Sequence, residues 1–424
     1  MPNRRSFLMD LRPLTEHPAF ARLWIGNTIA GLGSQMTVMA VMLHMYALTA
    51  SDMAVAMIAV AGLAPLIVSG LYGGMLADFF DRRTVALTAS SITWASTALL
   101  AVVAWTGHVD PAWLYALSII NSAANSVAGA TKSAMTPKLV GADLIPAASA
   151  LQGVAFGLMI MAGPALGGVL VAFLGYPLTY TVDVVLMLAL FLGLWSLPKL
   201  RPDGEGHSPG LQSVREGIAF LRRAPNIRTQ FVMDVTAMTF GNPQAIFPAV
   251  GVLILGGGEV TSGFLTASVA VGSIVAGLFS GRIVAFARQG VGIARAIQVY
   301  GVAVALFGVI LLIATGRPAS TALTVAACAF LVVMGGADNV SSIFRSSMLQ
   351  QAVPDAYRGR LQGINIVVVT GGPRLGALYY GALASLFAHW VPPVAGGMII
   401  VGVIAAIMRL APRFRAYDSA HPEP

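Results

Sequence analysis

Long apolar runs, separated by short polar segments, dominate this chain. A helix needs roughly 20 apolar residues to cross about 30 Å of hydrocarbon. Twelve runs reach that length, at 20–46, 52–77, 84–106, 111–135, 144–175, 177–198, 227–254, 260–281, 291–315, 319–345, 361–388 and 391–410. Because hydrocarbon leaves backbone groups no external hydrogen-bond partner, each run is expected to be helical. The pattern predicts an all-α membrane protein with twelve transmembrane helices.

The longest polar stretch, 199–226, divides these runs into six and six. Its first part, KLRPDGEGHSPG, has the proline and glycine content of a linker. In its second part Val214, Ile218 and Leu221 recur at helical spacing beside arginines, which predicts an amphipathic helix on the inner membrane surface. The expected organisation is an N-terminal six-helix bundle (1–198), a cytoplasmic linker (199–226) and a C-terminal six-helix bundle (227–424).

The two halves share a repeat. SAMTPKLV (133–140), LQG (151–153) and GPALG (163–167) recur in the same order as SSMLQQAV (346–353), LQG (361–363) and GPRLG (372–376). Three ordered matches at nearly constant offset are improbable by chance. Parallel repeats are a plan of transporters whose substrate site lies at the interface of the halves near the midplane. The alternative is structural duplication without transport.

Composition agrees with a membrane location. Of the 424 residues 57% are hydrophobic and 10% charged, whereas soluble proteins have about 25% charged residues. The net charge of +8 is spread over short segments, so no basic patch for nucleic acid is expected. Cys328 is the only cysteine and the six histidines lie far apart, so neither an internal disulfide nor a metal site is expected.

The basic residues predict orientation. If the N-terminus is inside, 24 of the 25 lysines and arginines fall in inner segments or at inner helix ends, and only Arg317 falls outside. This is the positive-inside bias. Both termini are therefore expected in the cytoplasm, with the chain in the cytoplasmic (inner) membrane of a bacterium.

A glycine-rich loop, GGMLADFFDRR (73–83), follows the second run. Gly74 permits close helix approach, and Asp78 can face a helix N-terminus or pair with basic groups. The loop, with Gly74, Asp78, Asp81, Arg82 and Arg83, resembles the signature of the major facilitator superfamily, with departures at 79 and 81. The resemblance implies a charged latch that opens in one transport state. A solvated turn that only sets topology is the alternative.

The fifth run carries GLMIMAGPALGG (157–168). Gly157, Gly163, Gly167 and Gly168 offer a smooth face for helix packing, and Pro164 can bend the helix. The motif resembles the glycine-proline signature of antiporters in the same superfamily. Generic packing of small residues is the alternative.

The resemblance extends along the chain through HPAFARLW, TPKLVGADLIPAASALQG and VPDAYRGRLQG. Together these stretches are similar to the bacterial drug:proton antiporter branch, which includes macrolide-efflux and siderophore-exporting members. The resemblance implies a proton-coupled secondary exporter of a small amphiphilic organic molecule, a siderophore or a drug, working by alternating access. It implies no cofactor, and a monomer suffices for this architecture.

Three acids, Asp183, Asp234 and Asp338, fall inside predicted helices. A charge at the bilayer centre costs about 2.5–3.5 kcal/mol or more, so such residues tend to be functional or paired. In the family's fold the helices carrying Asp234 and Asp338 line the cavity, which makes these two the better proton carriers. Asp338 has the alternative of an ion pair with Arg345, Asp234 that of facing water near the inner end, and Asp183 is expected to be structural.

Amides supply the candidate substrate contacts. They are Asn27, Gln35, Asn121, Asn125, Asn242, Gln244 and Asn339. Asn121 and Asn125 stand one turn apart on one helix face. For each amide, an interhelical hydrogen bond is the alternative.

Other functions fit the sequence less well than export does. A nutrient importer or uniporter of the same fold is the main alternative to an exporter. A primary pump is disfavoured because the chain has no GxxxxGK[ST] loop, and no motif of an enzyme is present.

The orientation is testable with cysteine labelling. On a Cys328→Ser background, a cysteine introduced near residue 207 should react with a membrane-impermeant maleimide only after cells are permeabilised. One beside Arg317 should react in intact cells. The reverse pattern would contradict both the orientation and the six-plus-six division.

Overall fold

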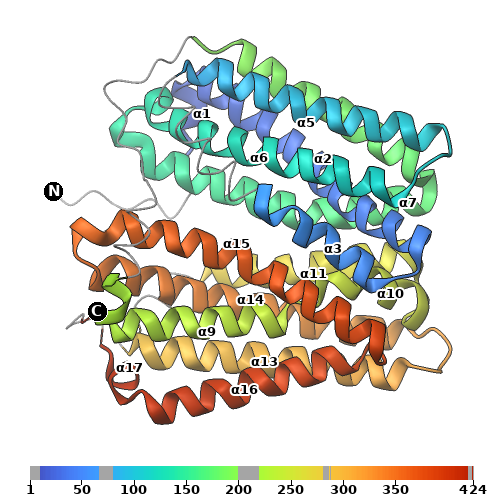
Figure 1. Ribbon diagram of the computed structural model, residues 1–424. Coiled ribbons are helices and arrows are strands. Elements are labelled where there is room, and N and C mark those ends of the chain that lie inside the picture. Colours follow the sequence, from blue (N-terminus) through green and yellow to red (C-terminus); the bar gives the residue numbers. More distant parts are fainter. Residues whose placement is uncertain are drawn as a thin grey trace. The chain divides into compact units, whose positions relative to one another are not determined.

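A computed structural model describes residues 10–65, 80–198, 219–279, 286, 288–418 and 423 of the chain. The described residues are mainly helical (Figure 1). The longer helices are α2 (Pro18–Thr49), α3 (Asp52–Ala61), α5 (Arg82–Trp105), α6 (Pro111–Val140), α7 (Ile145–Trp195), α9 (Pro225–Gly241), α11 (Gly258–Leu278), α13 (Gln289–Ala314), α14 (Thr321–Ala352), α15 (Asp355–Leu386) and α16 (Val391–Leu410). Eight described helices are long and apolar enough to cross a membrane, and the count of twelve stays a prediction.

The chain packs as two compact units. The first comprises Met1–Val41 and Ala64–Ser208, and the second comprises Met42–Leu63 and Pro209–Pro424. The boundaries between the units therefore fall inside α2, between residues 63 and 64 of the second predicted run, and inside the predicted linker. The amphipathic helix expected in that linker lies mostly outside the described residues, which resume at residue 219.

In the first unit, α7 spans the stretch where two helices were predicted. Its backbone is helical except at Gly175, which has φ 75° and ψ 174°. An L-residue with a side chain rarely adopts this positive φ, so glycine permits the chain to break direction here. The break lies where the predicted runs 144–175 and 177–198 meet, and it confirms that boundary.

The glycine face of α7 packs directly on α2 within this unit. A Cβ at Gly167 would lie 2.7 Å from the carbonyl oxygen of Met36, and one at Gly163 would collide with Gln35. Gly193, nearer the end of α7, approaches the carbonyl of Arg22 in the same way. Hydrocarbon provides no hydrophobic drive between helices, so close backbone packing of this kind holds α2 and α7 together.

The second copy of the glycine motif makes equivalent contacts in the second unit, where α15 packs on α9. A Cβ at Gly372 would lie 2.7 Å from Met238 Cβ, and one at Gly376 would lie 2.6 Å from the Met238 carbonyl oxygen. Both copies of the repeat thus bring a glycine-bearing helix against the first helix of their half.

The seventh predicted run, 227–254, is interrupted. Helix α9 ends at Gly241, and a 3₁₀ turn, η2 (Pro243–Ile246), a short α10 (Phe247–Ala249) and a π-helical turn, η3 (Val250–Ile254), follow. The break leaves carbonyls without helical donors, which hydrocarbon cannot satisfy. Two tyrosine hydroxyls supply the bonds: Tyr300 donates to the Gly241 carbonyl at 2.7 Å and Tyr380 to that of Phe240 at 3.1 Å.

The segment 42–63 belongs to the second unit because α3 packs on α15. Arg374 Nε donates to the Ala59 carbonyl at 2.8 Å. Arg374 therefore lies well inside α15, and its sequence-based assignment to an inner helix end is wrong. The positive-inside bias does not depend on this one residue.

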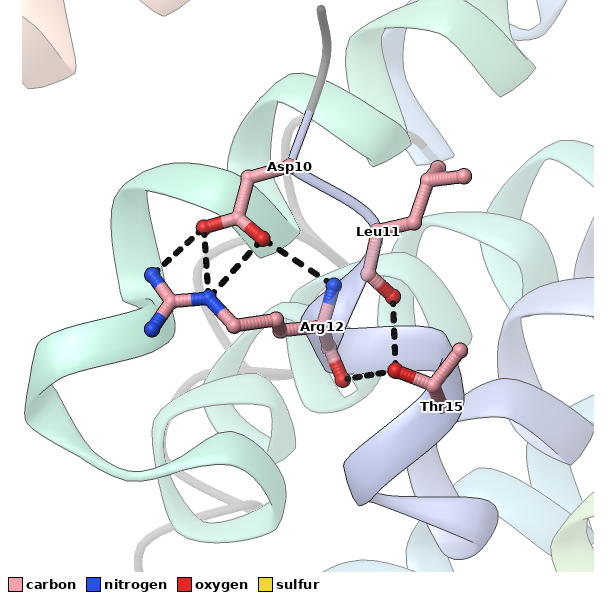
Figure 2. A network of polar contacts seen from close by, with 4 residues as sticks. All are labelled: Asp10, Leu11, Arg12 and Thr15. Carbon is pink, nitrogen blue, oxygen red and sulfur yellow. Dashed lines mark hydrogen bonds and ion pairs between the residues drawn. The ribbon is translucent and has the colours of Figure 1, made fainter. Parts of the chain in front are cut away.

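Before α2, a short helix, α1 (Arg12–Glu16), begins next to an exposed ion pair. Figure 2 shows the Arg12 guanidinium against the Asp10 carboxylate, with Nη2 to Oδ2 at 2.7 Å. Hydrogen bonding by Arg12 lowers the pKa of Asp10. Because both groups are exposed, this pair contributes little to stability.

Close packing at Gly167 predicts a position-specific loss of stability. Gly167→Ala should lower the free energy of unfolding by about 1–3 kcal/mol, because the added methyl group forces α7 away from α2. Thermal unfolding of the purified protein would measure the loss.

Gly153→Ala on the same helix is the matched control. A Cβ at Gly153 meets no atom within 4 Å, and alanine is the better helix former, so this variant should be as stable as the parent or more so. Equal stability of the two variants would refute the close-packing interpretation.

Candidate functional site

A cavity of about 660 Å³ lies within the first unit and is lined by residues of α2, α6 and α7. Drug-sized ligands occupy pockets of about 300–1,000 Å³. The lining mixes polar and apolar side chains, as sites for amphiphilic molecules do. The described lining residues are Phe20, Leu23, Trp24, Asn27, Ala30, Gly31, Ser34, Gln35, Asn125, Gly129, Lys132, Ser133, Thr136, Ser149, Gln152, Gly153, Ala155, Phe156, Met159, Met187 and Leu190.

Lys132 is the charged residue of this lining. Its Nζ donates to Asn27 Oδ1 at 2.6 Å, which joins α6 to α2 across the cavity wall. A second bond, from Gln152 Nε2 to Thr136 Oγ1 at 2.8 Å, joins α7 to α6. These bonds fix the polar side of the cavity, and they leave Lys132 with only a neutral partner among the described residues.

The apolar part of the cavity lining consists of aromatic and aliphatic side chains. Phe20 and Trp24 contribute from α2, and Phe156 and Met159 contribute from α7. Phe156 is exposed and Phe20 is buried, so the aromatic surface extends from the packed interior to the open part of the cavity. Flat rings and a thioether contact varied apolar surfaces favourably.

The amides predicted on the N-terminal half divide into two groups. Asn27, Gln35 and Asn125 line the cavity. Asn121 instead donates to Ser96 Oγ and Thr97 Oγ1 of α5, both at 3.3 Å, and accepts from Asn125 at 2.6 Å. Asn121 therefore forms interhelical hydrogen bonds to α5, and its side-chain oxygen also binds the Asn125 amide.

Asp183 lies on α7 and is buried against α2. Its Oδ2 accepts from Thr37 Oγ1 at 2.6 Å, and its Oδ1 has no hydrogen-bond partner among the described residues. A Cβ at Gly33 would collide with this carboxylate. The residue is absent from the described cavity lining, and its environment favours the structural role expected for it.

The second unit holds a cluster of three charged groups. Arg345 of α14 makes an ion pair with Asp234 of α9, and its Nη2 lies 3.6 Å from Asp338 Oδ1 on its own helix. The Asp234 side chain is 2% exposed and that of Asp338 is 36% exposed. One guanidinium thus faces two carboxylates, of which only Asp338 is open to its surroundings. The alternative considered for Asp338, a contact with Arg345, is present, and its function as a proton carrier stays a prediction.

The remaining amides of the C-terminal half have local contacts. Asn242 ends α9, and its Oδ1 accepts from the backbone N–H of Gln244 at 3.4 Å. Asn339 Oδ1 is buried and has no hydrogen-bond partner among the described residues. Asn242, Gln244 and Asn339 are all absent from the described cavity lining.

The predicted gating loop is described only in part. Gly74 and Asp78 lie outside the described residues. Asp81 caps α5 by accepting from the Thr84 N–H at 3.2 Å, and Arg82 Nη1 donates to the Ala134 carbonyl of α6 at 2.9 Å. Arg83 Nη2 reaches the Trp195 carbonyl at the end of α7, also at 2.9 Å. These bonds join α5 to α6 and α7, and the role of the loop as a latch stays a prediction.

The glycine-proline motif lies beside the cavity. Gly163, Pro164, Gly167 and Gly168 are buried, and Gly157 is partly buried. Gly163 packs against Gln35, which also lines the cavity. The motif therefore sets the distance between two walls of the cavity.

Sequence reasoning missed three features. Lys132 was counted only as a topology signal, and Arg345 was considered only as a partner of Asp338. The third is a contact between His389 Nε2 and Asp52 Oδ2 at 2.8 Å, within the second unit. Lys132 lies seven residues after Asn125, a spacing that places both on the same helix face. From this spacing the sequence could have predicted that Lys132 lines the cavity together with Asn125. Nothing in the sequence indicated the pairing of Asp52 with His389.

Comparison with known proteins supports the fold and the family resemblance. A profile of the family described as transmembrane secretion effectors matches residues 9–424. The enterobactin exporter EntS of Shigella boydii serotype 18 is 25% identical over 413 residues, which cover 96% of this chain and 95% of the relative. EntS of Escherichia coli O9:H4 gives the same identity and coverage.

Solved transporters share the architecture. The nucleoside transporter NupG aligns with a TM-score of 0.69 at 15% identity and covers 92% of this chain and 98% of its own. A D-xylose-proton symporter aligns with a TM-score of 0.69 at 14% identity, covering 95% and 98%. A bacterial homologue of ferroportin, in the inward-facing state, gives 0.67 at 12% identity, covering 94% and 99%. At these identities the likeness shows the fold, which is the major facilitator fold.

The charge cluster predicts a stability effect that can be rescued. Arg345→Gln should destabilise the protein by about 3–5 kcal/mol, because it leaves Asp234 buried without its partner. Arg345→Gln combined with Asp234→Asn should recover most of the loss.

Arg409→Gln, which changes an exposed arginine on α16, is the control and should be neutral. Unfolding midpoints of the purified variants would measure these effects, and failure of the double variant to exceed the single one would contradict the pairing.

Proposed function

We propose that this chain, which belongs to the transmembrane secretion effector family, is a proton-coupled secondary exporter of a small amphiphilic organic molecule. The observation that carries the proposal is the match with enterobactin exporters along 96% of the chain. Similarity over that length extends across nearly the whole of both units. A molecule of the siderophore type is the first substrate class to test, and a drug-like amphiphile is the second.

The cavity of the first unit supports the substrate part of the proposal. It has the volume of a small-ligand site, and its lining includes the polar groups of Lys132 and Asn27 and the aromatic rings of Trp24 and Phe156. An amphiphile can contact both kinds of group at once. The packing of Gly163 on Gln35 connects this cavity to the glycine-proline motif, so a bend in α7 would change the cavity's width.

The charge cluster supports the coupling part. With both carboxylates ionised, Asp234, Asp338 and Arg345 carry one net negative charge, and binding one proton makes the cluster neutral. Burying a net charge in hydrocarbon is unfavourable, so a proton bound here accompanies a change in exposure. Asp338 is the proposed carrier because it is the more exposed acid, while Asp234 holds Arg345 in place.

The proposed topology follows the basic residues. Both termini and the linker 199–226 lie in the cytoplasm, the chain resides in the bacterial inner membrane, and it works as a monomer of two six-helix halves. Asp78 and Asp81 with Arg82 and Arg83 form a latch on the cytoplasmic side. The bonds from Arg82 to the Ala134 carbonyl of α6 and from Arg83 to the Trp195 carbonyl at the end of α7 are the contacts that such a latch would break and remake.

Export is testable in everted membrane vesicles, in which an exporter moves substrate into the lumen. Respiring vesicles containing the protein should accumulate labelled enterobactin or erythromycin, and a protonophore should abolish the accumulation. Accumulation that is unaffected by the protonophore would reject proton coupling. Concentrative movement in the opposite direction, in right-side-out vesicles, would favour an importer.

Asp338→Asn separates coupling from binding. This variant should lose proton-driven accumulation by at least tenfold, while exchange of external for internal substrate, which needs no net proton movement, continues. Asp183→Asn, which changes a buried acid of the first unit in the same way, is the control and should keep coupled transport. Full coupled transport by Asp338→Asn would remove Asp338 from the mechanism.

A further inference from the structure

Lys132 carries a positive charge into the membrane region. It is residue 132 of a helix that runs Pro111–Val140, about two turns before the end. A lysine at such a depth is costly unless it finds a partner or faces an aqueous cavity. Lys132 does both, because it lines the cavity and donates to Asn27.

The partner, however, does not neutralise the charge. Asn27 offers a neutral amide oxygen, and an ammonium group has three hydrogens to donate. No ion pair involving Lys132 occurs among the described residues, and no described lining residue is acidic. Asp183 of α7 is hydrogen-bonded to Thr37 and lies outside the described lining. Among the described residues, the positive charge of Lys132 is therefore not compensated.

Polar and aromatic residues around Lys132 indicate which kind of ligand this charge can bind. Ser133 and Thr136 follow on the same helix, and Gln35 and Asn125 bring further hydrogen-bonding groups to the cavity. The rings of Trp24 and Phe156 belong to the same lining. A ligand with an anionic oxygen at one end and an aromatic body at the other would meet a charge-assisted hydrogen bond and an apolar wall together.

We infer that the cavity selects anionic aromatic molecules, whose carboxylate or phenolate oxygen binds Lys132 Nζ. This inference rests on the proposed export function and narrows its substrate class. It sets Lys132 apart from the basic residues that only determine topology. Asn27 acts as the positioning residue, because it holds the ammonium group at the cavity wall until the ligand's oxygen arrives.

Binding of two matched probes tests the inference. The probes are 2-naphthoate and its neutral analogue 2-naphthamide, measured by calorimetry with the full-length protein in lipid nanodiscs at pH 7.4. The two have nearly the same shape and differ in charge. The parent protein should bind 2-naphthoate at least tenfold more tightly than 2-naphthamide. Equal affinities would overturn the inference, whatever any variant does.

Variants of two lysines on α6 complete the test. Lys132→Gln should abolish the preference by weakening 2-naphthoate binding alone, and Lys132→Arg should keep a preference because it keeps the charge. Lys138→Gln makes the same change on an exposed residue outside the lining and should leave both affinities unchanged. A preference that survives in Lys132→Gln, with normal insertion and unfolding, would also overturn the inference.

The outcome is independent of the export assay. Vesicles that export substrate while the purified protein binds both probes equally would leave the export function standing and refute the anion site. Charge-selective binding without export in vesicles would establish the site and refute the function.

Discussion

Hydrocarbon offers no hydrogen-bond partner and little screening, so each polar group in the membrane region must find its partner inside the protein. The structure meets this constraint repeatedly. The tyrosines Tyr300 and Tyr380 bind the carbonyls freed where α9 breaks, and Thr37 binds Asp183. Arg345 pairs with Asp234. Polar residues that sit singly in an apolar run are therefore joined in pairs by the packing of their helices.

Among the described residues, charge pairing is incomplete for Lys132 in the first unit and for Asp338 in the second. Lys132 has a neutral partner, so the first unit keeps a positive charge beside its cavity. Asp338 shares Arg345 with Asp234, the more deeply buried of the two acids, and is itself the more exposed one. Under the proposed function, Lys132 exchanges a ligand and Asp338 exchanges a proton without breaking the helix packing around them.

Close backbone packing gives these polar groups their geometry. The glycines of α7 bring it onto α2, and the repeated glycines of α15 bring it onto α9. Gly163 is opposite Gln35, and Gly376 is opposite Met238 and Asn242. A helix seated on backbone atoms slides or bends with few side-chain obstacles, because no large side chain interlocks the pair. The same motif thus provides close helix packing in both halves, and under the proposed function it also permits conformational change.

The sequence by itself determined the membrane class, the approximate bounds of the helices and the break at Gly175, because apolar length and backbone preference are local properties. It also identified the three acids within helices and the glycine motif, which depend on residue type. Only the tertiary structure decided which face of each helix meets which neighbour. Asn121 and Asn125 stand one turn apart, yet Ser96 and Thr97 of α5 bind the first, while the second lines the cavity. Likewise Lys132 became a cavity residue because Asn27, 105 positions away in sequence, packs opposite it. Partnerships of this kind depend on helices that are distant in sequence, and no local pattern encodes them.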